Sequence, residues 1–387
     1  MDLEKEKTKR LVSWYKGEKS GPFKIDIEIH RRCNLKCLSC SRRGDEKYGQ
    51  INSFSKTIEM SKEKWLNIID QAANLGVKEW HIAGGGDPPL LKDITFPVLK
   101  KIKKYGMYGI LTTNGTNLNK EQIKTIVDIN WDRIHFSIDG PDAKTHDYLR
   151  GVKGCFNKTI STIKQLNNYR SKKRIDKPML NINTVLSTEN YNKLDKMVEL
   201  AKKLNIQYMF VEPLIVYSKQ GEGLKLKEKQ LKQFQEYLKK AKELAKKYGI
   251  DNNFSQLDKN LDEKLIKNSS LMNEVIEEDM KKYNHSFLSV ACYDPWFHMT
   301  IKADGRTISC DVATDEGDNI QNKSLKEIWY GNYFQKHRKS LLNKQIPDFC
   351  AQCNPSHTTQ RRRLRKELDV RLQTPIFSRI INKLLKK

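Results

Sequence analysis

The chain has 387 residues, of which 31% are charged, and its 72 Lys and Arg against 47 Asp and Glu give a formal net charge of +25. It contains no run of about 18 apolar residues, which argues against a membrane-spanning helix, and residues 1–10 lack the apolar core of a secretory signal. Eight cysteines without such a signal favour metal binding or catalysis over disulfides. The positive charge is equally typical of Lys-rich solvated helices and of a protein that attracts anions.

Short apolar segments alternate with amphipathic segments between residues 23 and 212. The predicted strands are 23–30, 79–83, 108–112, 133–138, 180–186 and 208–211, and the predicted helices lie near 61–75, 92–105, 119–129, 155–170 and 190–204. Apolar residues recur in these helices at spacings of three and four, as Trp65, Ile68, Ile69 and Ala72 do. Six successive βα units predict an α/β fold with a parallel sheet and right-handed crossovers, curved into a partial (β/α)6 barrel.

Five parts are predicted along the chain. They are an N-terminal extension (1–22), the partial barrel (23–220), a helical connector (221–290), a small Cys-rich α+β domain (291–355) and a basic helical tail (356–387). Asp304-Gly305 predicts a tight turn between two strands of the small domain. After Pro375, apolar and basic residues alternate at helical spacing, which predicts an amphipathic helix that lies on an anionic membrane or docks on the barrel or a partner.

Three cysteines, Cys33, Cys37 and Cys40, follow the first predicted strand with three and then two intervening residues. Three thiolates leave one corner of a [4Fe-4S] cube without a protein ligand, so that an iron is open to a small molecule. A zinc site would need a fourth ligand, for which His30 or a distant residue is a candidate. The spacing favours a cluster with one open iron.

Polar and glycine-rich loops follow the next three predicted strands. Gly84, Gly85, Gly86 and Asp87 come after the second strand, and Thr113 and Asn114 follow the third. Ser137 lies near the end of the fourth strand, and Asp139 follows it. Ligands bind at the carboxyl ends of parallel strands, so these loops are expected to converge there with the cysteines. Taken singly, each loop is also explained by ordinary turn chemistry.

A second set of cysteines, Cys292, Cys310, Cys350 and Cys353, lies in the small domain. Four thiols saturate one [4Fe-4S] cluster or one zinc ion. Asp311 follows Cys310 directly and is a candidate base, with a surface turn residue as the alternative. The remaining cysteine, Cys155, begins a predicted helix and is expected to be a packed helix residue.

The Cys33-x3-Cys37-x2-Cys40 motif, together with the loops that follow, resembles the radical S-adenosylmethionine (SAM) superfamily. The resemblance implies that the open iron binds the amino and carboxylate groups of SAM and that SAM is cleaved to a 5′-deoxyadenosyl radical. The SAM contacts it implies are Gly84, Gly85, Gly86, Asp87, Thr113, Asn114, Ser137, Asp139 and Asn183. The motif departs from the family at Ser39, where an aromatic residue is common, and at Asp87, where Glu is usual.

The second cysteine set resembles the shortened SPASM, or twitch, extension of radical SAM enzymes. That extension implies one fully ligated auxiliary cluster at Cys292, Cys310, Cys350 and Cys353, and therefore two [4Fe-4S] clusters in all. In the sulfatase-maturating oxidases of this superfamily, an Asp corresponding to Asp311 is proposed to take the substrate proton.

The function we expect is hydrogen-atom abstraction from a substrate C–H bond in a two-electron oxidation, with the auxiliary cluster accepting an electron and Asp311 acting as base. Peptide cross-linking or thioether formation and epimerisation, with Cys155 as a hydrogen-atom donor, are alternatives. A zinc- or cluster-bearing nucleic-acid-binding protein is the alternative of another class, although nucleic acid is not the expected partner. Expected partners are a small-molecule, sugar or peptide substrate and a flavodoxin or ferredoxin. A cytoplasmic location is expected, with peripheral contact at the inner face of the membrane through the tail as an option.

Overall fold

A computed structural model describes residues 2–43, 59–257, 272–283, 286–315, 317–353 and 355–373. Its centre is an open nine-stranded sheet in the order β7-β6-β5-β4-β3-β2-β1-β8-β9, in which every pairing except β8 with β9 is parallel. The strands are β1 (Lys24–Ile27), β2 (Glu79–Ile82), β3 (Tyr108–Thr113), β4 (Arg133–Ser137), β5 (Met179–Leu186), β6 (Tyr208–Pro213), β7 (Asp251–Asn252), β8 (His298–Ile301) and β9 (Thr307–Ile308).

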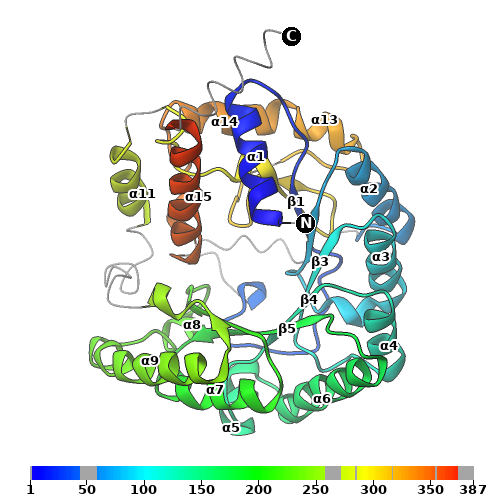
Figure 1. Cartoon of the computed structure of the whole chain (residues 1–387), viewed down its shortest axis with the longest axis vertical. Helices are drawn as coiled ribbons and strands as arrows, with labels where there is room; N and C mark the ends of the chain where they lie inside the picture. Colours follow the sequence, from blue (N-terminus) through cyan, green and yellow to red (C-terminus); the bar gives the residue numbers. More distant parts are fainter. Residues whose placement is uncertain are drawn as a thin grey trace.

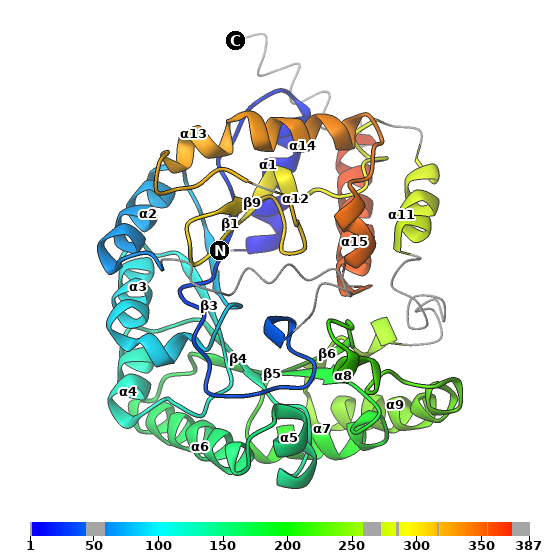
Figure 2. The same ribbon diagram turned by 180° about the vertical axis from the view of Figure 1, so that it is seen from behind.

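Helices cover the outer face of the sheet and surround it in a ring (Figures 1 and 2). From the N-terminus they are α1 (Leu3–Tyr15), α2 (Lys62–Asn74), α3 (Lys92–Lys104), α4 (Lys120–Asp128), α5 (Ala143–Arg150), α6 (Cys155–Lys173), α7 (Leu194–Lys203), α8 (Lys219–Glu222), α9 (Glu228–Tyr248), α11 (Met272–Lys281), α12 (Asp294–Phe297), α13 (Leu325–Trp329), α14 (Asn332–Leu342) and α15 (Pro355–Gln373). Helices α2 to α9 form one arc of the ring, and α11, α15, α14 and α13 complete it.

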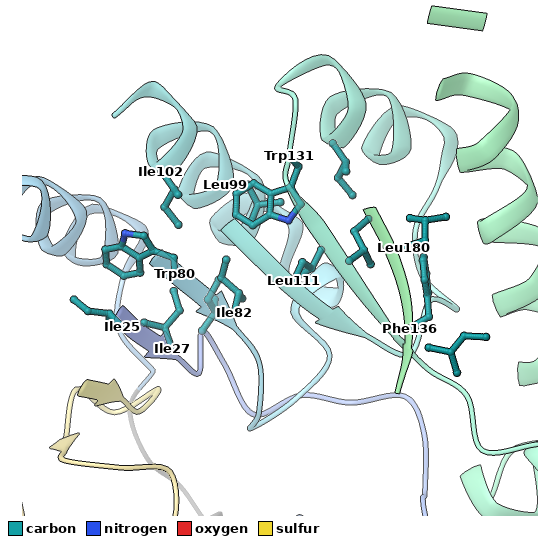
Figure 3. Close-up of a cluster of buried hydrophobic side chains, with 14 of the residues drawn as sticks. Ile25, Ile27, Trp80, Ile82, Leu99, Ile102, Leu111, Trp131, Phe136 and Leu180 are labelled. Carbon is teal, nitrogen blue, oxygen red and sulfur yellow. The ribbon is translucent and has the colours of Figure 1, made fainter. Parts of the chain in front are cut away.

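Residue alternation along the strands decides which face is apolar. Ile25 and Ile27 of β1, Trp80 and Ile82 of β2 and Leu111 of β3 are buried in one core with residues of the surrounding helices, such as Leu99 and Ile102 (Figure 3). Side chains of a strand point alternately to its two faces, so the residues between these point to the inside of the curved sheet. Several of them are polar or titratable, among them Asp26 and His81. The inner face is therefore chemically different from the outer one.

The predicted partial barrel and its alternating order of strands and helices are confirmed. The first strand is shorter than the predicted 23–30 and spans Lys24–Ile27, after which the Glu28 amide still bonds to the Ile301 carbonyl. Helix α5, which is not among the predicted helices, begins where the Asp142 side chain accepts a hydrogen bond from the Thr145 amide. The connector also contains a short strand, β7, that the helical prediction missed.

The small Cys-rich domain is continuous with the barrel sheet, which the sequence did not indicate. Strand β8 pairs in parallel with β1, with Lys24 opposite His298 and Asp26 opposite Thr300. The predicted hairpin is confirmed, since Thr300 pairs with Ile308 and Gly305 occupies the turn with φ +86°. The two predicted domains therefore share one sheet.

Both ends of the described chain pack together over the small domain. Helix α15 lies beside α1, where the Thr8 hydroxyl donates to Glu367 at 2.9 Å. On another side of α15, Arg362 pairs with Asp279 of α11 at 2.6 Å. The first part of the predicted basic tail is thus docked on the protein, and the predicted amphipathic segment after Pro375 lies outside the described residues. Within the described ranges, no helix combines the length and apolar character needed to cross a membrane.

Asp132 ties together the amino-terminal ends of β3 and β4. Its buried carboxylate pairs with Lys103 at 2.5 Å and with Lys177 at 2.6 Å. The same carboxylate accepts a hydrogen bond from the Gly109 amide at 2.9 Å. A buried charge is tolerated only when it is paired and hydrogen-bonded, and Asp132 meets both conditions.

We expect Asp132→Asn to lower the free energy of unfolding by roughly 2–4 kcal/mol, because it leaves two lysines beside a neutral group at a buried position. The measurement is the midpoint of thermal unfolding of the cluster-free protein. Asp128→Asn, which removes an exposed partner of Lys173, is the matched control and is expected to change stability by less than about 0.5 kcal/mol. Equal midpoints for the two variants would contradict this role of Asp132.

Candidate active site

The loop that carries Cys33, Cys37 and Cys40 follows β1 and rests on the end of α5. The Lys36 amide donates to the Arg150 carbonyl and the Leu38 amide to the Leu149 carbonyl, each at 3.0 Å. Gly151 ends α5 with φ +66°, and a Cβ there would lie 2.4 Å from the Lys36 carbonyl oxygen. Only glycine allows this close approach, so the end of α5 positions the cysteine loop.

Hydrogen-bond donors surround the three thiols. The Arg150 guanidinium lies 3.8 Å from Cys37 Sγ, and the side-chain nitrogen Nδ2 of Asn114 lies 4.0 Å from Cys33 Sγ. Burial raises the pKa of the Cys33 and Cys40 thiols. Thiols in such a site become ligands when a metal displaces their protons, and nearby donors stabilise the resulting negative charge. The donor set fits the predicted cluster with three protein ligands.

The glycine run packs against the cysteine loop. A Cβ at Gly86 would lie 2.1 Å from the Arg32 carbonyl oxygen, and one at Gly85 would lie 2.6 Å from the His30 carbonyl oxygen. A Cβ at Gly84 would meet the Glu28 side chain at 3.2 Å. Close contact with the chain leading to Cys33 therefore explains these glycines, and their contact with SAM stays a prediction.

Asp87 connects the loops after β2 and β3. Its buried carboxylate accepts hydrogen bonds from the Thr113 hydroxyl and the Asn114 amide, both at 2.8 Å. Burial raises the pKa of Asp87 to about 6, although the two donors act to lower it. The predicted SAM residues Asp87, Thr113 and Asn114 are thus in direct contact, with Asn114 also beside Cys33.

Asp139 forms a buried ion pair that sequence reasoning missed. Arg150 Nη2 lies 2.8 Å from Asp139 Oδ2, and the Val185 amide donates to Asp139 Oδ1 at 2.9 Å. The carboxylate therefore joins α5 and β5 and orients the same guanidinium that lies beside Cys37. A contact between Asp139 and SAM stays a prediction. The available sequence signal was Asp142, a favourable N-cap residue, which indicates the start of the helix that ends at Arg150.

Ser137 and Asn183 stand opposite each other near the carboxyl ends of β4 and β5. The Asn183 side-chain nitrogen lies 3.4 Å from His135 Nδ1. Asn183 Oδ1 and His135 Nε2 are both buried and have no hydrogen-bond partner among the described residues. Such atoms normally have a partner, so this part of the barrel interior fits a polar ligand such as SAM. Burial lowers the pKa of His135 well below its usual value, which keeps the ring neutral at pH 7.

The second cysteine set surrounds one cavity. Cys292, Cys310, Cys350 and Cys353 line a space of about 490 Å³ together with His357 and Arg361 of α15. Arg361 Nη1 lies 3.3 Å from Cys353 Sγ, and the Asp294 amide lies 3.4 Å from Cys292 Sγ. Four thiols around one cavity, with donors to their sulfurs, fit the predicted closed cluster.

Asp311 connects this cavity to the inner face of the sheet. It accepts a hydrogen bond from the Thr300 hydroxyl at 2.6 Å, and its carboxylate lies within 4.8 Å of ligand atoms of Asp26 and His298. His298 Nε2 lies 3.4 Å from Asp26 Oδ2. Burial alone would lower the pKa of His298, but Asp26 and Asp294 raise it to about 10, so the imidazole is a cation at pH 7.

Sequence reasoning did not select Asp26, His81 or His298. His81 Nδ1 lies 3.6 Å from Asp26 Oδ2, so the three side chains form a polar row across β2, β1 and β8. The available signal was the alternation Lys24-Ile25-Asp26-Ile27, which places Asp26 on the face opposite the apolar core.

Comparisons with known proteins agree with this geometry. Residues 27–201 match the model of the radical SAM superfamily, and residues 292–354 match that of SPASM, an iron–sulfur cluster-binding domain. An AdoMet-dependent heme synthase from Methanosarcina barkeri is 26% identical over 314 residues, which cover 80% of this chain and 82% of that protein. A PqqA peptide cyclase from Rhizobium meliloti is 24% identical over 340 residues, or 86% of this chain and 79% of that protein.

Solved structures share the fold. Streptococcus suis SuiB bound to S-adenosylmethionine superposes with a TM-score of 0.60 at 17% identity, covering 85% of this chain and 71% of SuiB. The anSMEcpe protein with bound AdoMet superposes with a TM-score of 0.56 at 17% identity, covering 93% of this chain and 98% of that one. Together with the two matched domains, the cysteine loop and the parallel sheet place this chain in the radical SAM superfamily, as an enzyme that carries a SPASM domain.

Proposed function

We propose that this radical SAM enzyme carries out a two-electron oxidation of its substrate, with Asp311 as the base. The observation that carries the proposal is the position of Asp311, whose neighbour Cys310 lines the auxiliary cavity and whose carboxylate bonds to Thr300 of the barrel sheet. A carboxylate between the auxiliary cavity and the barrel sheet is suited to take a proton from a substrate held inside the barrel.

Cys33, Cys37 and Cys40 would hold one [4Fe-4S] cluster, and Cys292, Cys310, Cys350 and Cys353 a second. When bound, the first cluster and SAM supply a 5′-deoxyadenosyl radical that abstracts a hydrogen atom, and the second supplies an electron acceptor. The chain itself provides the two thiol sets and the donors beside them, Arg150 and Arg361. Asn183 and His135 offer polar atoms to SAM inside the barrel.

Asp311 is held in place for its proposed role. The Thr300 hydroxyl donates a hydrogen bond to Asp311 Oδ1 at 2.6 Å, and the Asp26–His298 pair lies beside the Asp311 carboxylate. His298, a cation at pH 7, lies within 4.8 Å of the Asp311 carboxylate together with Asp26. Asp311 is accessible to a substrate, since its side chain is exposed towards a large cavity.

Peptide cross-linking or thioether formation is the second candidate, supported by the likeness to the PqqA peptide cyclase and to SuiB, which was solved with its precursor peptide. Epimerisation requires a hydrogen-atom donor. The only thiol outside the two sets, Cys155, is buried and bonded to Asp147 at 3.1 Å, and burial raises its pKa to about 12, which supports its prediction as a packed residue. A flavodoxin or ferredoxin as electron donor and a membrane contact through the tail remain proposals.

The first prediction concerns cluster content and SAM cleavage. The reconstituted chain is expected to hold about eight iron atoms, because each [4Fe-4S] cluster contributes four. Replacing Cys33, Cys37 and Cys40 together by Ala should remove half of the iron and abolish reductive formation of 5′-deoxyadenosine under anoxic conditions. Cys155→Ala is the matched control and should retain both. Zinc in place of iron would refute the proposal and favour the nucleic-acid-binding alternative. SAM cleavage that survives the triple replacement would refute the role of these three cysteines.

The second prediction isolates Asp311. Asp311→Asn removes the proton acceptor and keeps the side-chain shape, so 5′-deoxyadenosine should still form while product formation falls by about 100-fold or more. Asp318→Asn, which removes a partner of Lys323 in the same domain, is the control and should retain product formation. Chromatography with mass detection of both compounds in one reaction separates the two steps. Full product formation by Asp311→Asn would exclude it as the base.

A further inference from the structure

A cavity opens at the amino-terminal ends of the barrel strands, whereas the cysteine loop follows the carboxyl end of β1. The first residues of four strands line it: Lys24, Glu79, Tyr108 and Arg133. Helices α1 and α15 border the cavity, and Asp294, Asp311 and His357 line both this cavity and the auxiliary one. It leaves about 1120 Å³ of space, part of it open to solvent. A substrate in this cavity has direct access to Asp311.

The charges that line the cavity are paired, with one exception. Lys24 lies 3.0 Å from Asp26, Lys7 lies 3.0 Å from Glu4, and Arg363 lies 2.5 Å from Glu4. His298 lies between Asp26 and Asp294, and His357 lies 4.0 Å from Cys353 Sγ. Among these cationic side chains, Arg133 alone has neither a carboxylate nor a thiol partner within the described part of the chain.

Arg133 is half-buried, and its guanidinium has one contact among the described residues, from Nη2 to Met179 Sδ at 3.7 Å. Its Nε is buried and has no hydrogen-bond acceptor there. A guanidinium has five N–H donors in a planar fork that matches a carboxylate, and burying a charged donor without a partner is costly. The fork of Arg133 is therefore ready to receive an anion.

The backbone holds Arg133 in place. The preceding residue, Asp132, is tied to Lys103 and Lys177, and Arg133 itself pairs with Ile110 of β3 and Met179 of β5. The same hydrogen-bonded row runs through His81 and Asp26 to Thr300, the residue that bonds Asp311. Arg133 and the proposed base thus belong to one row of the sheet and line one cavity.

We propose that Arg133 is the anchor for a carboxylate group of the substrate. This inference rests on the proposed function, because it names the class of substrate that would reach Asp311. A single carboxylate is favoured over a phosphate dianion because Glu79, Asp294 and Asp311 line the same cavity and one cation is unpaired. Tyr108, whose pKa burial raises, stays a neutral hydroxyl donor beside the site.

The test uses phenylglyoxal, which modifies guanidinium groups, on the cluster-loaded full chain under anoxic conditions without reductant, with propionate and propionamide as probes. We expect Arg133 to be modified, and 100 mM propionate to slow its modification at least about threefold while propionamide has no effect. Peptide mass mapping also follows Arg363, whose partners are Glu4 and Glu367 and whose modification should be insensitive to both probes. An Arg133 that is not modified, or that propionate fails to protect selectively, overturns the proposal.

A second measurement uses variants. Propionate should raise the thermal unfolding midpoint of the wild type and of Arg363→Gln more than that of Arg133→Gln, because a ligand that binds the folded state stabilises it and Arg133→Gln removes the binding group. Arg133→Lys keeps the charge without the fork and should retain a smaller shift. Equal shifts in wild type and Arg133→Gln contradict the assignment. Neither experiment requires SAM cleavage, so a failure here is distinguishable from a failure of the proposed oxidation.

Discussion

The parallel pairing of β1 with β8 is the interaction on which the rest of the structure depends. The carboxyl end of β1 leads into the loop with Cys33, Cys37 and Cys40, while β8 lies between Cys292 and Cys310. One stretch of four paired residues therefore connects the two cysteine sets. It also places Thr300 opposite Asp26, which brings Asp311 to the inner face of the barrel. Without this pairing, Asp311 would be a turn residue of a separate small domain.

The charged side chains of the polar inner face are stabilised by ion pairs with one another rather than by contact with solvent. Asp26 is buried between Lys24, His81 and His298, and Asp139 is buried against Arg150. Buried charges are costly unless partners compensate them, and each of these carboxylates has such partners from other strands or helices. Several buried polar atoms of the described residues have no hydrogen-bond partner, and those of Arg133, Asn183 and His135 belong to barrel strands. We assign ligands to these three groups.

The fold and the cysteine sites could be predicted from local signals. Apolar spacing in α2 and strand alternation in β2 to β6 predicted the βα units, and the positions of Cys33, Cys37 and Cys40 predicted a site at the sheet edge. Arg150 was not predicted as a site residue because its role depends on the ion pair with Asp139 and the contact with Cys37, and both residues are distant from it in sequence. The contact between Asp26 and His298 was not predicted for the same reason, because 271 residues separate them in the sequence.

The sequence by itself determined the family of this protein and predicted its cysteine ligand sets, because cysteine spacing and hydrophobic periodicity act within a few residues. Only the tertiary structure decided that the two predicted domains share a sheet, that α15 places Arg361 beside Cys353, and that Arg133 lines the cavity near Asp311 without a carboxylate partner among the described residues. These facts depend on strand register and on contacts between elements far apart in the chain. Such contacts arise from long-range packing and charge compensation, which leave no local pattern in the sequence.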